Sequence, residues 1–563
     1  MSLDYKPWIK FYNGRPAETE VPELSLYGIL SERAKTNPEF FAVEYMGAKL
    51  TFKELTGLID NAADALCALG VEEGDCVTLA LPNIPNAVIL FYAVNKIGAR
   101  VAMVHPLSPS VDLEYYLNKT GSKWAVTVDM FVPKFMDIIG KTAVEKLVVC
   151  GIADYLPKLK AIAYSLTNKA KLPANAGLLV KWKDFLKTGA AASEKQEESG
   201  RGCHEASVIL FSGGTSDLPK GIVLSDFSFN ALAVNTQKTS DFEAGDSIVA
   251  ILPVFHGFGL GLCIHMAMVC GGMSILIPKF STENYIGALM KHKPQFIAGV
   301  PTLFEALLRD PGFKSVRFDK LKGAYSGGDS LPHEAKMKFD AALRAQGSKV
   351  DLLEGYGTTE CVTACVLTPP GNYRKGSIGV PMVNMETCIV REDTTEVLPP
   401  NEEGEICIAG PQLMVSYLDD CEATARTLRI HSDGKLWLHS GDQGYMDADG
   451  YLYFKSRIKR IFKVSGVNVY PPQVEYVLES HPAVSKACVI GVHDDYQGKS
   501  VKAFIVLADN AGGDSELADE LRAYCAERLI KWSVPKTIVF RKELPTTLVG
   551  KVAYTALEKA ASN

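Results

Sequence analysis

The chain has 563 residues, of which 47% are hydrophobic and 22% charged, and its formal net charge is −6. This composition is typical of a globular protein of more than one domain, and the near balance of charge argues against a nucleic-acid groove. We find neither a signal peptide nor a run of about 20 apolar residues, so we expect a cytoplasmic protein.

Along the first part of the chain, helical and strand patterns alternate. Residues 51–70 place apolar side chains three and four apart and end at Gly70, which predicts a helix with its C-terminal stop. Residues 75–83 predict a buried strand, 86–99 a second helix and 100–106 a second strand. This strand–helix–strand order favours a mostly parallel sheet.

Residues 187–206 are poor in large apolar side chains and predict an exposed loop or weak linker, after which SVILF predicts a strand. Residues 441–457 resemble short hairpins. After them the pattern restarts, with helices expected at 471–482 and 515–530 and strands at 485–492 and 501–508. We therefore predict an α/β protein: a large N-terminal domain of parallel-rich sheets with helices (1–458) and a small, mobile α+β C-terminal domain (459–563).

The thirteen cysteines are scattered, and no CxxC pair occurs. CVTAC at residues 361–365 is accompanied by no set of histidines and cysteines with zinc spacing. We expect buried, reduced thiols, as is usual in a cytosolic protein.

Residues 210–225 read LFSGGTSDLPKGIVLS and follow the strand predicted at SVILF. Gly213 and Gly214 let backbone N–H groups approach a ligand, and Lys220 and three hydroxyl groups suit an anion. The hydroxyl groups are those of Ser212, Thr215 and Ser216. Lys220 follows a proline, so the spacing is not that of the Walker loop. Taken alone, the segment leaves an anion site and a plain surface turn as equal alternatives.

Four further segments suit a nucleotide. EGYGTTE (354–360) combines an aromatic ring, two threonines and a carboxylate, which suit a base, a phosphate and Mg2+. LHSGDQG presents Asp442, whose carboxylate can accept hydrogen bonds from ribose hydroxyls. KSRIKRIFKVSGVNVYPPQVE gathers basic residues before Gly466, and PTTLVGKVAY contains Lys551. With the motifs in this order and spacing, residues 25–557 resemble the adenylate-forming enzymes: acyl-CoA synthetases, luciferases and peptide-synthetase adenylation domains.

The resemblance implies an ATP site with Mg2+. SGGTSDLPKG resembles the loop over the β- and γ-phosphates, but Ser216 replaces the usual threonine and Asp217 the usual glycine, which adds a negative charge beside an anion. SGGDSL (326–331) resembles the segment lining the adenine and acyl sites. Tyr356 is expected to stack on adenine, Thr359 to contact the α-phosphate and Glu360 to bind Mg2+. The implied cofactor-binding residues are Ser212, Gly213, Gly214, Thr215, Ser216, Lys220, Gly328, Gly355, Tyr356, Gly357, Thr358, Asp442, Arg457, Lys459 and Gly466.

The resemblance also implies catalysis in two steps. His256, in PVFHGFG, is expected to line the acyl channel near the carboxylate. Lys551 matches the adenylation lysine, a mobile cation that stabilises charge gathering on the α-phosphate. Lys459 matches the hinge about which the small domain turns. Lys463 and Gly466 match the segment that reaches the site for the second step, where Gly466 leaves a path for pantetheine.

The reaction implied is ATP-dependent activation of a carboxylic acid and transfer to coenzyme A. Residues 147–172 resemble bacterial fatty acyl-CoA ligases, so we expect a medium- or long-chain fatty acid, with an aryl acid as the alternative. The glycines of HGFGLGL either leave room for a long chain or pack a helix closely. Other readings are an enzyme that loads a separate carrier protein, and a non-catalytic nucleotide-binding homologue. Contact with a membrane surface and a monomeric or homodimeric state are left open.

Overall fold

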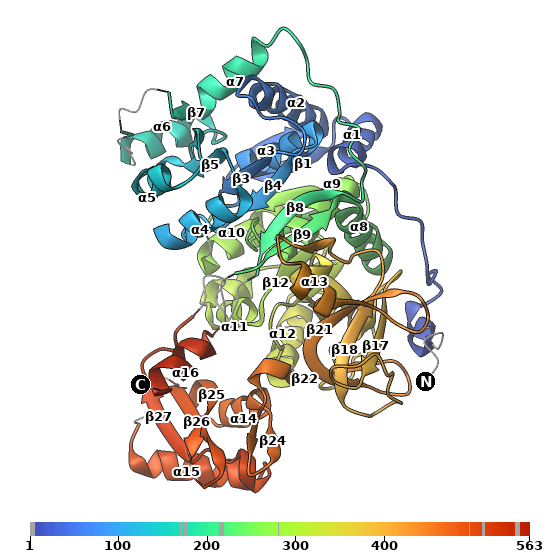
Figure 1. The fold of residues 1–563 in the computed structure, drawn as a ribbon, viewed down its shortest axis with the longest axis vertical. Coiled ribbons are helices and arrows are strands. Elements are labelled where there is room, and N and C mark those ends of the chain that lie inside the picture. Colours follow the sequence, from blue (N-terminus) through green and yellow to red (C-terminus); the bar gives the residue numbers. More distant parts are fainter. Residues whose placement is uncertain are drawn as a thin grey trace.

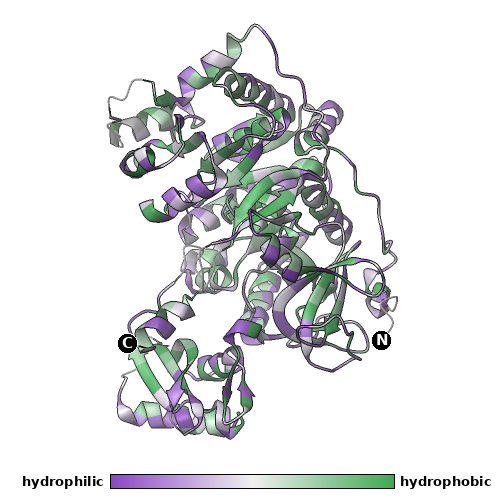
Figure 2. Cartoon of the chain, in the orientation of Figure 1, coloured by the Kyte–Doolittle hydropathy of each residue, from purple (hydrophilic) through white to green (hydrophobic). Residues whose placement is uncertain are grey.

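The structure is a computed structural model, and it describes residues 6–167, 172–173, 177–212, 219–279, 281–494, 496–508, 513–546 and 552–562. Two large mixed sheets, a smaller antiparallel sheet and their helices form the body of the molecule (Figure 1). A small α+β unit at the C-terminus, red in Figure 1, lies at one end. The hydrophobic strands concentrate in the interior of both parts, as Figure 2 shows.

The first large sheet has nine strands and is parallel through its centre, from β1 to β14. In spatial order its strands are β16 (Val380–Pro381), β15 (Ala364–Leu367), β14 (Leu352–Gly357), β13 (Gly323–Ser326), β12 (Phe296–Gly299), β10 (Ser247–Ala250), β11 (Met273–Leu276), β1 (Phe41–Tyr45) and β2 (Ala48–Thr51). Its central strands are buried on both faces, which explains their continuous apolar sequences.

The second large sheet has eight strands, parallel from β8 to β7, with β9 and β19 added antiparallel at one edge. In spatial order its strands are β19 (Ser416–Tyr417), β9 (Gly221–Ser225), β8 (Ala206–Phe211), β4 (Arg100–Met103), β3 (Cys76–Ala80), β5 (Trp124–Val128), β6 (Lys146–Cys150) and β7 (Leu179–Lys181). This order confirms the parallel sheet expected from the first half of the chain.

Helices cover the two large sheets and join their strands. They are α1 (Leu26–Thr36), α2 (Phe52–Ala68), α3 (Pro85–Ile97), α4 (Ser110–Thr120), α5 (Val132–Ile138), α6 (Lys158–Thr167), α7 (Trp182–Ala190), α8 (Asp226–Ser240), α9 (Ala267–Val269), α10 (Thr282–His292), α11 (Pro301–Arg309), α12 (His333–Ala345) and α13 (Cys421–Thr427). Thr51 and Glu54 form a capping box at the start of α2, and Gly70 (φ +88°) follows its end, as the sequence predicts.

One local expectation needs correction. Residues 187–190 belong to α7 because Trp182 and Phe185 of that helix are buried, whereas 191–205 lack regular structure as expected. That segment is not a loose linker, since Arg201 Nη2 makes a buried ion pair with Asp226 at 2.6 Å. Residues 258–266 form the π-helix η4 (Phe258–Met266), which is buried along its whole length. π-helices are rare and are frequently found at functional sites.

The third sheet consists of β17 (Glu386–Val390), β18 (Gly404–Ala409), β21 (Leu436–Met446), β20 (Leu428–Ile430) and β22 (Leu452–Arg457). The C-terminal unit contains the hairpin β23 (Phe462–Val464) and β24 (Val467–Val469), the sheet β25 (Val484–Asp494), β26 (Gly498–Leu507) and β27 (Thr537–Arg541), and the helices α14 (Pro471–Glu479), α15 (Ser515–Ala526) and α16 (Tyr554–Ser562). It buries separate apolar clusters, beginning at Phe462. The smaller C-terminal α+β domain is therefore confirmed.

Candidate active site

The glycine-rich loop begins where β8 ends and closes where β9 begins. Ser212 N–H donates to the Lys220 carbonyl at 3.0 Å, and Lys220 N–H donates to Ser212 Oγ at 3.1 Å. These two bonds extend the β8–β9 ladder and hold the two ends of the loop together. Four of its predicted phosphate-binding residues, Gly213, Gly214, Thr215 and Ser216, lie outside the described residues, as does Asp217.

Tyr417 connects this loop to the segment that contains Glu360. Lys220 Nζ lies 4.5 Å from the centre of the Tyr417 ring, and Tyr417 O–H donates to Glu360 Oε1 at 2.8 Å. Tyr417 is on β19, which pairs antiparallel with β9. Motif reading did not identify Tyr417, because only this pairing of distant strands brings its ring over Lys220. The arrangement places a cation over the face of one aromatic ring and a carboxylate at the hydroxyl of the same ring.

The segment from Gly355 to Glu360 begins with the last three residues of β14 and turns into the short 3-10 helix η6 (Thr359–Cys361). A Cβ on Gly357 would lie 1.5 Å from the Thr363 carbonyl oxygen, so this position admits only glycine. Gly355 has ordinary van der Waals space around it. Thr358 is buried, whereas Thr359 and Glu360 are half-buried. Close packing therefore explains Gly357 without a ligand, and Thr359 and Glu360 keep access to one.

Asp442 is the centre of a second cluster. Its side chain, 1% exposed, accepts a hydrogen bond from Tyr356 O–H at 2.7 Å and pairs with Arg457 Nε at 3.1 Å. The three residues come from β21, β14 and β22, and Asp442 and Arg457 are direct partners across the β21–β22 ladder. Burial, and then the Asp442 charge, raise the pKa of Tyr356. The structure thus brings together the three residues predicted to hold the nucleoside.

The segments 326–331 and 354–360 meet at Glu354. The Leu331 N–H donates to Glu354 Oε1 at 3.0 Å, and Gly328 in the first of these segments adopts a left-handed conformation with φ +82°. Glu354 is 8% exposed, and burial raises the pKa of its carboxyl to about 7. This perturbed carboxyl group was not singled out in the sequence, where a glutamate at the end of an apolar run carries no signal of burial.

His256 lies at the entry to η4 and is half-buried, and its Nδ1 accepts the Phe258 N–H at 3.1 Å. The glycines around it pack closely. An added Cβ would lie 1.7 Å from the Val362 carbonyl oxygen at Gly257, 2.2 Å from the Pro253 carbonyl oxygen at Gly259 and 2.6 Å from Leu232 Cδ2 at Gly261. Of the two alternatives for these glycines, close packing of a helix is the one that this structure contains.

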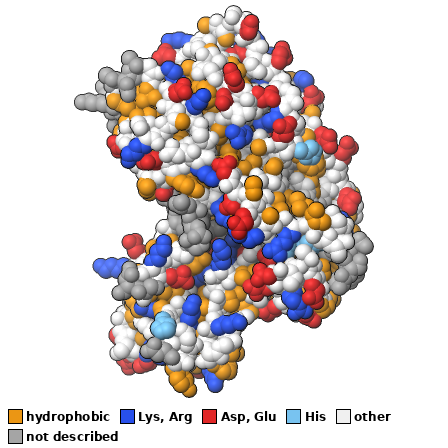
Figure 3. All heavy atoms as spheres, viewed as in Figure 1, with side chains coloured by type: hydrophobic (Ala, Val, Ile, Leu, Met, Phe, Trp, Pro, Cys, Tyr) orange, Lys and Arg blue, Asp and Glu red, His pale blue; other side chains and the backbone are white. Residues whose placement is uncertain are grey.

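The remaining predicted residues belong to the small C-terminal unit and its junction. Lys459, in the 3-10 turn η7 (Ile458–Arg460), and Lys463, on β23, are exposed. Gly466 (φ +82°) and Ser465 (φ +50°) form the two-residue turn of the β23–β24 hairpin, as type I′ turns require. Lys551 lies outside the described residues. Both basic and acidic side chains lie along the visible rim of the hollow between this unit and the body (Figure 3).

Comparison with known proteins identifies the family. The model of the AMP-binding enzyme family matches residues 30–418, and the model of its C-terminal domain matches residues 473–551. The chain belongs to the AMP-binding enzyme family. The first match includes the loop closed by Ser212 and Lys220, and Glu360 and Tyr417. Asp442 and Arg457 lie between the two matched ranges.

Several relatives of this AMP-binding enzyme are known. A long-chain-fatty-acid–CoA ligase of Bacillus subtilis strain 168 is 36% identical over 97% of this chain and 96% of the relative. A feruloyl-CoA synthase of an Amycolatopsis species is 28% identical over 92% of this chain and 96% of the relative. The structure of an anthranilate CoA ligase in complex with anthranoyl-AMP is similar in fold, with a TM-score of 0.83, 24% identity and 98% coverage of both chains.

These findings confirm the resemblance to adenylate-forming enzymes and the expectation of an AMP-forming acyl-CoA ligase. Within the described part of the chain, no helix has the length and apolar composition to cross a membrane. The roles of individual site residues, the domain boundary after residue 458 and the cellular compartment stay predictions.

Proposed function

We propose that this AMP-binding enzyme converts a medium- or long-chain fatty acid into its coenzyme A thioester. The carboxylate oxygen attacks the α-phosphorus of ATP, and pyrophosphate leaves. The thiol sulfur of coenzyme A then attacks the carbonyl of the acyl-adenylate, loses its proton and displaces AMP. No covalent bond to the protein forms in either step.

One observation carries the proposal: Tyr417 joins the base of the glycine-rich loop to Glu360. In the proposal the loop closed at Ser212 and Lys220 binds the phosphates of ATP, and Lys220 supplies a cation beside them. Glu360 presents a half-buried carboxylate whose Oε1 is oriented by Tyr417. Carboxylate oxygens are the ligands Mg2+ prefers, so the residue fits that ion. Bound Mg2+ would offset the negative charge of the phosphates.

The Asp442 cluster supports recognition of the nucleoside. In the proposal adenine stacks on the ring of Tyr356, while the Asp442 carboxylate accepts hydrogen bonds from the ribose hydroxyls. Asp442 is suited to this because Tyr356 and Arg457 already hold it as a buried, charged acceptor. His256 and Thr359 would act near the reacting carboxylate and the α-phosphate.

The second step needs a different arrangement of the C-terminal unit. We propose a domain boundary after residue 458, with Lys459 as the hinge and Lys551 as the adenylation lysine. Rotation about the hinge would remove Lys551 and present Lys463 and the Gly466 turn. That turn is exposed and carries no side chain at Gly466, which suits passage of a narrow pantetheine arm.

The fatty acid is supported by the long-chain-fatty-acid–CoA ligase relative, which is 36% identical over nearly the whole chain. The feruloyl-CoA synthase relative, at 28% identity, keeps an aryl acid as the second candidate. Both candidates share the same chemistry at the carboxylate and differ in the side chain that must be accommodated beyond it.

The test is incubation of the purified protein with Mg-ATP and a pool of fatty, aryl and amino acids, with and without coenzyme A, read by mass spectrometry. We expect a fatty acyl-CoA, AMP and pyrophosphate. Lys551→Ala should abolish adenylation but still form thioester from supplied acyl-adenylate, while Lys559→Ala, an exposed lysine of α16, should behave as the wild type. Adenylate that is never passed to coenzyme A would indicate a carrier-protein acceptor. Absence of adenylate from every acid would indicate a non-catalytic homologue.

We also propose that α6 contacts an anionic bilayer surface. Leu159, Ile162 and Leu166 are 84%, 58% and 72% exposed and fall on one helical face, next to Lys158 and Lys160. Leu159→Glu should weaken sedimentation with vesicles that contain phosphatidylserine, whereas Ile530→Glu, at an exposed site in the C-terminal unit, should not. Equal sedimentation of both variants would contradict this contact.

A further inference from the structure

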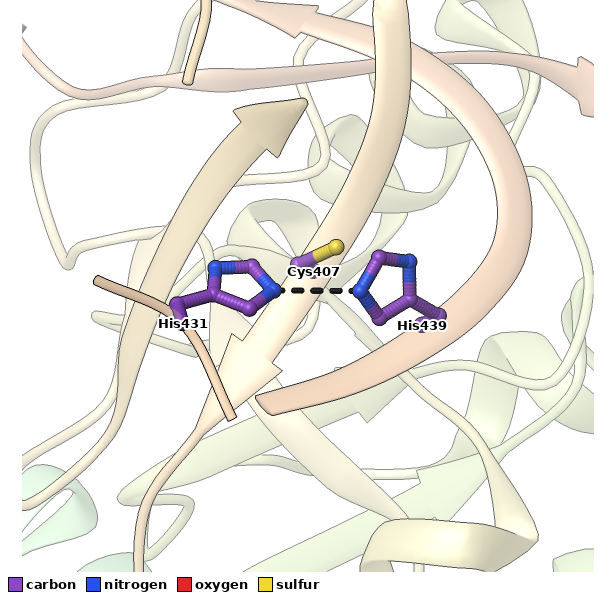
Figure 4. A group of neighbouring side chains, drawn as sticks. All are labelled: Cys407, His431 and His439. Carbon is purple, nitrogen blue, oxygen red and sulfur yellow. Dashed lines mark hydrogen bonds between the residues drawn. The ribbon is translucent and has the colours of Figure 1, made fainter. Parts of the chain in front are cut away.

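Three side chains that the proposed reaction does not use converge inside the third sheet. Cys407 comes from β18, His439 from the neighbouring strand β21, and His431 from the turn between β20 and β21. All three are buried, and their ligand atoms lie within 4.8 Å of one another. Figure 4 shows the two imidazole rings facing each other beside the Cys407 sulfur. The sequence alone did not predict this group, because Cys407, His431 and His439 do not have the short spacing of the common zinc-binding motifs.

Glu405 fixes the orientation of His439. The His439 Nδ1 lies 2.8 Å from Glu405 Oε2, and the other carboxylate oxygen accepts the Gly441 N–H at 2.9 Å. Since a carboxylate accepts, Nδ1 carries the proton of the neutral ring and Nε2 presents its lone pair to the centre of the group. A carboxylate behind the distal nitrogen of a histidine is the usual outer-shell arrangement of metal-binding histidines.

His431 is held by packing. Its ring stacks on Trp437, with centroids 5.2 Å apart and planes at 16°. Its Nε2 lies 3.0 Å from His439 Nε2, whereas the buried Nδ1 has no hydrogen-bond partner among the described side chains and backbone groups. His431 Nε2 and His439 Nε2 therefore both point into the space beside the Cys407 sulfur. Two ligands of a tetrahedral Zn2+ ion, each at ~2.0–2.1 Å, would lie about 3.3 Å apart, close to this separation.

We propose that Cys407, His431 and His439 form a binding site for Zn2+ that cross-links β18, β21 and the turn after β20. One thiolate and two imidazoles suit this ion. Binding releases one proton, from the Cys407 thiol, and moves the His431 proton from Nε2 to Nδ1. The thiolate and the Glu405 carboxylate together balance the two positive charges. Because the ligands lie outside the Asp442 cluster, the role is structural.

The test uses the full-length protein stripped of metal with a chelator and then titrated with Zn2+ or Co2+. We expect one tightly held ion per chain by elemental analysis, the absorption band of a thiolate bound to Co2+, and a higher melting temperature with Zn2+. Cys407→Ser and His431→Gln should each lose the band. Glu405→Gln should keep it but bind roughly 10–100-fold more weakly. Cys525→Ser, which removes a buried thiol of α15, should match the wild type.

Three results would overturn the site: a wild-type protein without the thiolate–Co2+ band, a band that persists in both ligand variants, or a band lost equally in Cys525→Ser. The wild-type titration decides the matter if the variants fail to fold, since it needs no substitution. Acyl-CoA formation is not a readout here, so failure of the proposed reaction would leave the result intact.

Discussion

Replacing Tyr417 by phenylalanine isolates one hydrogen bond of the proposed active site. The change removes the hydroxyl that donates to Glu360 at 2.8 Å and keeps the ring beneath the Lys220 ammonium group. Tyr417 is 7% exposed and phenylalanine fills nearly the same volume, so the fold should persist. If Glu360 acts with Mg-ATP, the substitution should slow formation of the adenylate and leave transfer from supplied acyl-adenylate to coenzyme A unchanged.

The expected magnitude follows from the environment of the bond. A hydrogen bond to a charged group contributes ~1.5–3 kcal/mol, and the half-buried position of Glu360 places this one at the lower end. A loss of about 1.5 kcal/mol corresponds to a roughly tenfold lower kcat/KM for ATP. Tyr417→Leu also removes the ring from Lys220, which should cost a further ~0.5–1 kcal/mol.

The assay is pyrophosphate release with saturating acid and coenzyme A and varied Mg-ATP, with thermal unfolding as the check on folding. Tyr453→Phe is the matched control, because its hydroxyl also donates to a carboxylate, that of Asp447 at 3.3 Å, away from the proposed site. If Tyr417→Phe stays within twofold of the wild type, the Tyr417–Glu360 bond has no part in adenylation and our assignment of Glu360 is refuted.

Three further predictions test other parts of the structure. Asp442→Asn should raise the KM for ATP roughly tenfold or more, because it removes the charged acceptor proposed for ribose; an unchanged KM in steady-state kinetics would exclude that role. Gly357→Ala should lower the free energy of unfolding, measured by urea titration, by about 3 kcal/mol, because its Cβ would meet the Thr363 carbonyl oxygen at 1.5 Å. The control Gly57→Ala, which has open space around it in α2, should leave this free energy unchanged or raise it. The raised pKa of Glu354, about 7 against 4.5, favours the folded state below pH 4.5, and this contribution is lost as pH rises through 7. The melting temperature of Glu354→Gln should therefore rise relative to that of the wild type between pH 5 and pH 8. If the difference in melting temperature between the two proteins is the same at pH 5 and at pH 8, the Glu354 carboxyl does not have the raised pKa expected from its burial.

Elements with local signals were predictable from the sequence. The helix α2 lies between the capping residue Thr51 and Gly70, and its apolar spacing continues without interruption between them. The strands β3 and β8 are short apolar runs flanked by turn residues. The π-helix η4 was not predictable, because its glycines carry no periodicity and its geometry depends on close contact with Val362 and Pro253.

The candidate site also contains residues that the sequence predicted and residues that only the structure revealed. Asp442, Tyr356 and Arg457 stand in motifs recognisable one by one, and the structure brings them into contact. Tyr417 and Glu354 were missed, since the role of the first depends on the β9–β19 pairing and the pKa of the second on burial. Neither the β9–β19 pairing nor the burial of Glu354 can be predicted from the residues next to them in the sequence.

By itself, the sequence determined the family motifs, the alternation of strands and helices that leads to parallel sheets, and the restart of the pattern in the C-terminal part. These depend on residue order and short-range periodicity, which the chain carries locally. Only the tertiary structure decided that Tyr417 lies between Lys220 and Glu360, and that Cys407 faces His431 and His439. Those encounters arise when distant strands pair, and pairing depends on the packing of whole sheets, which no single segment specifies.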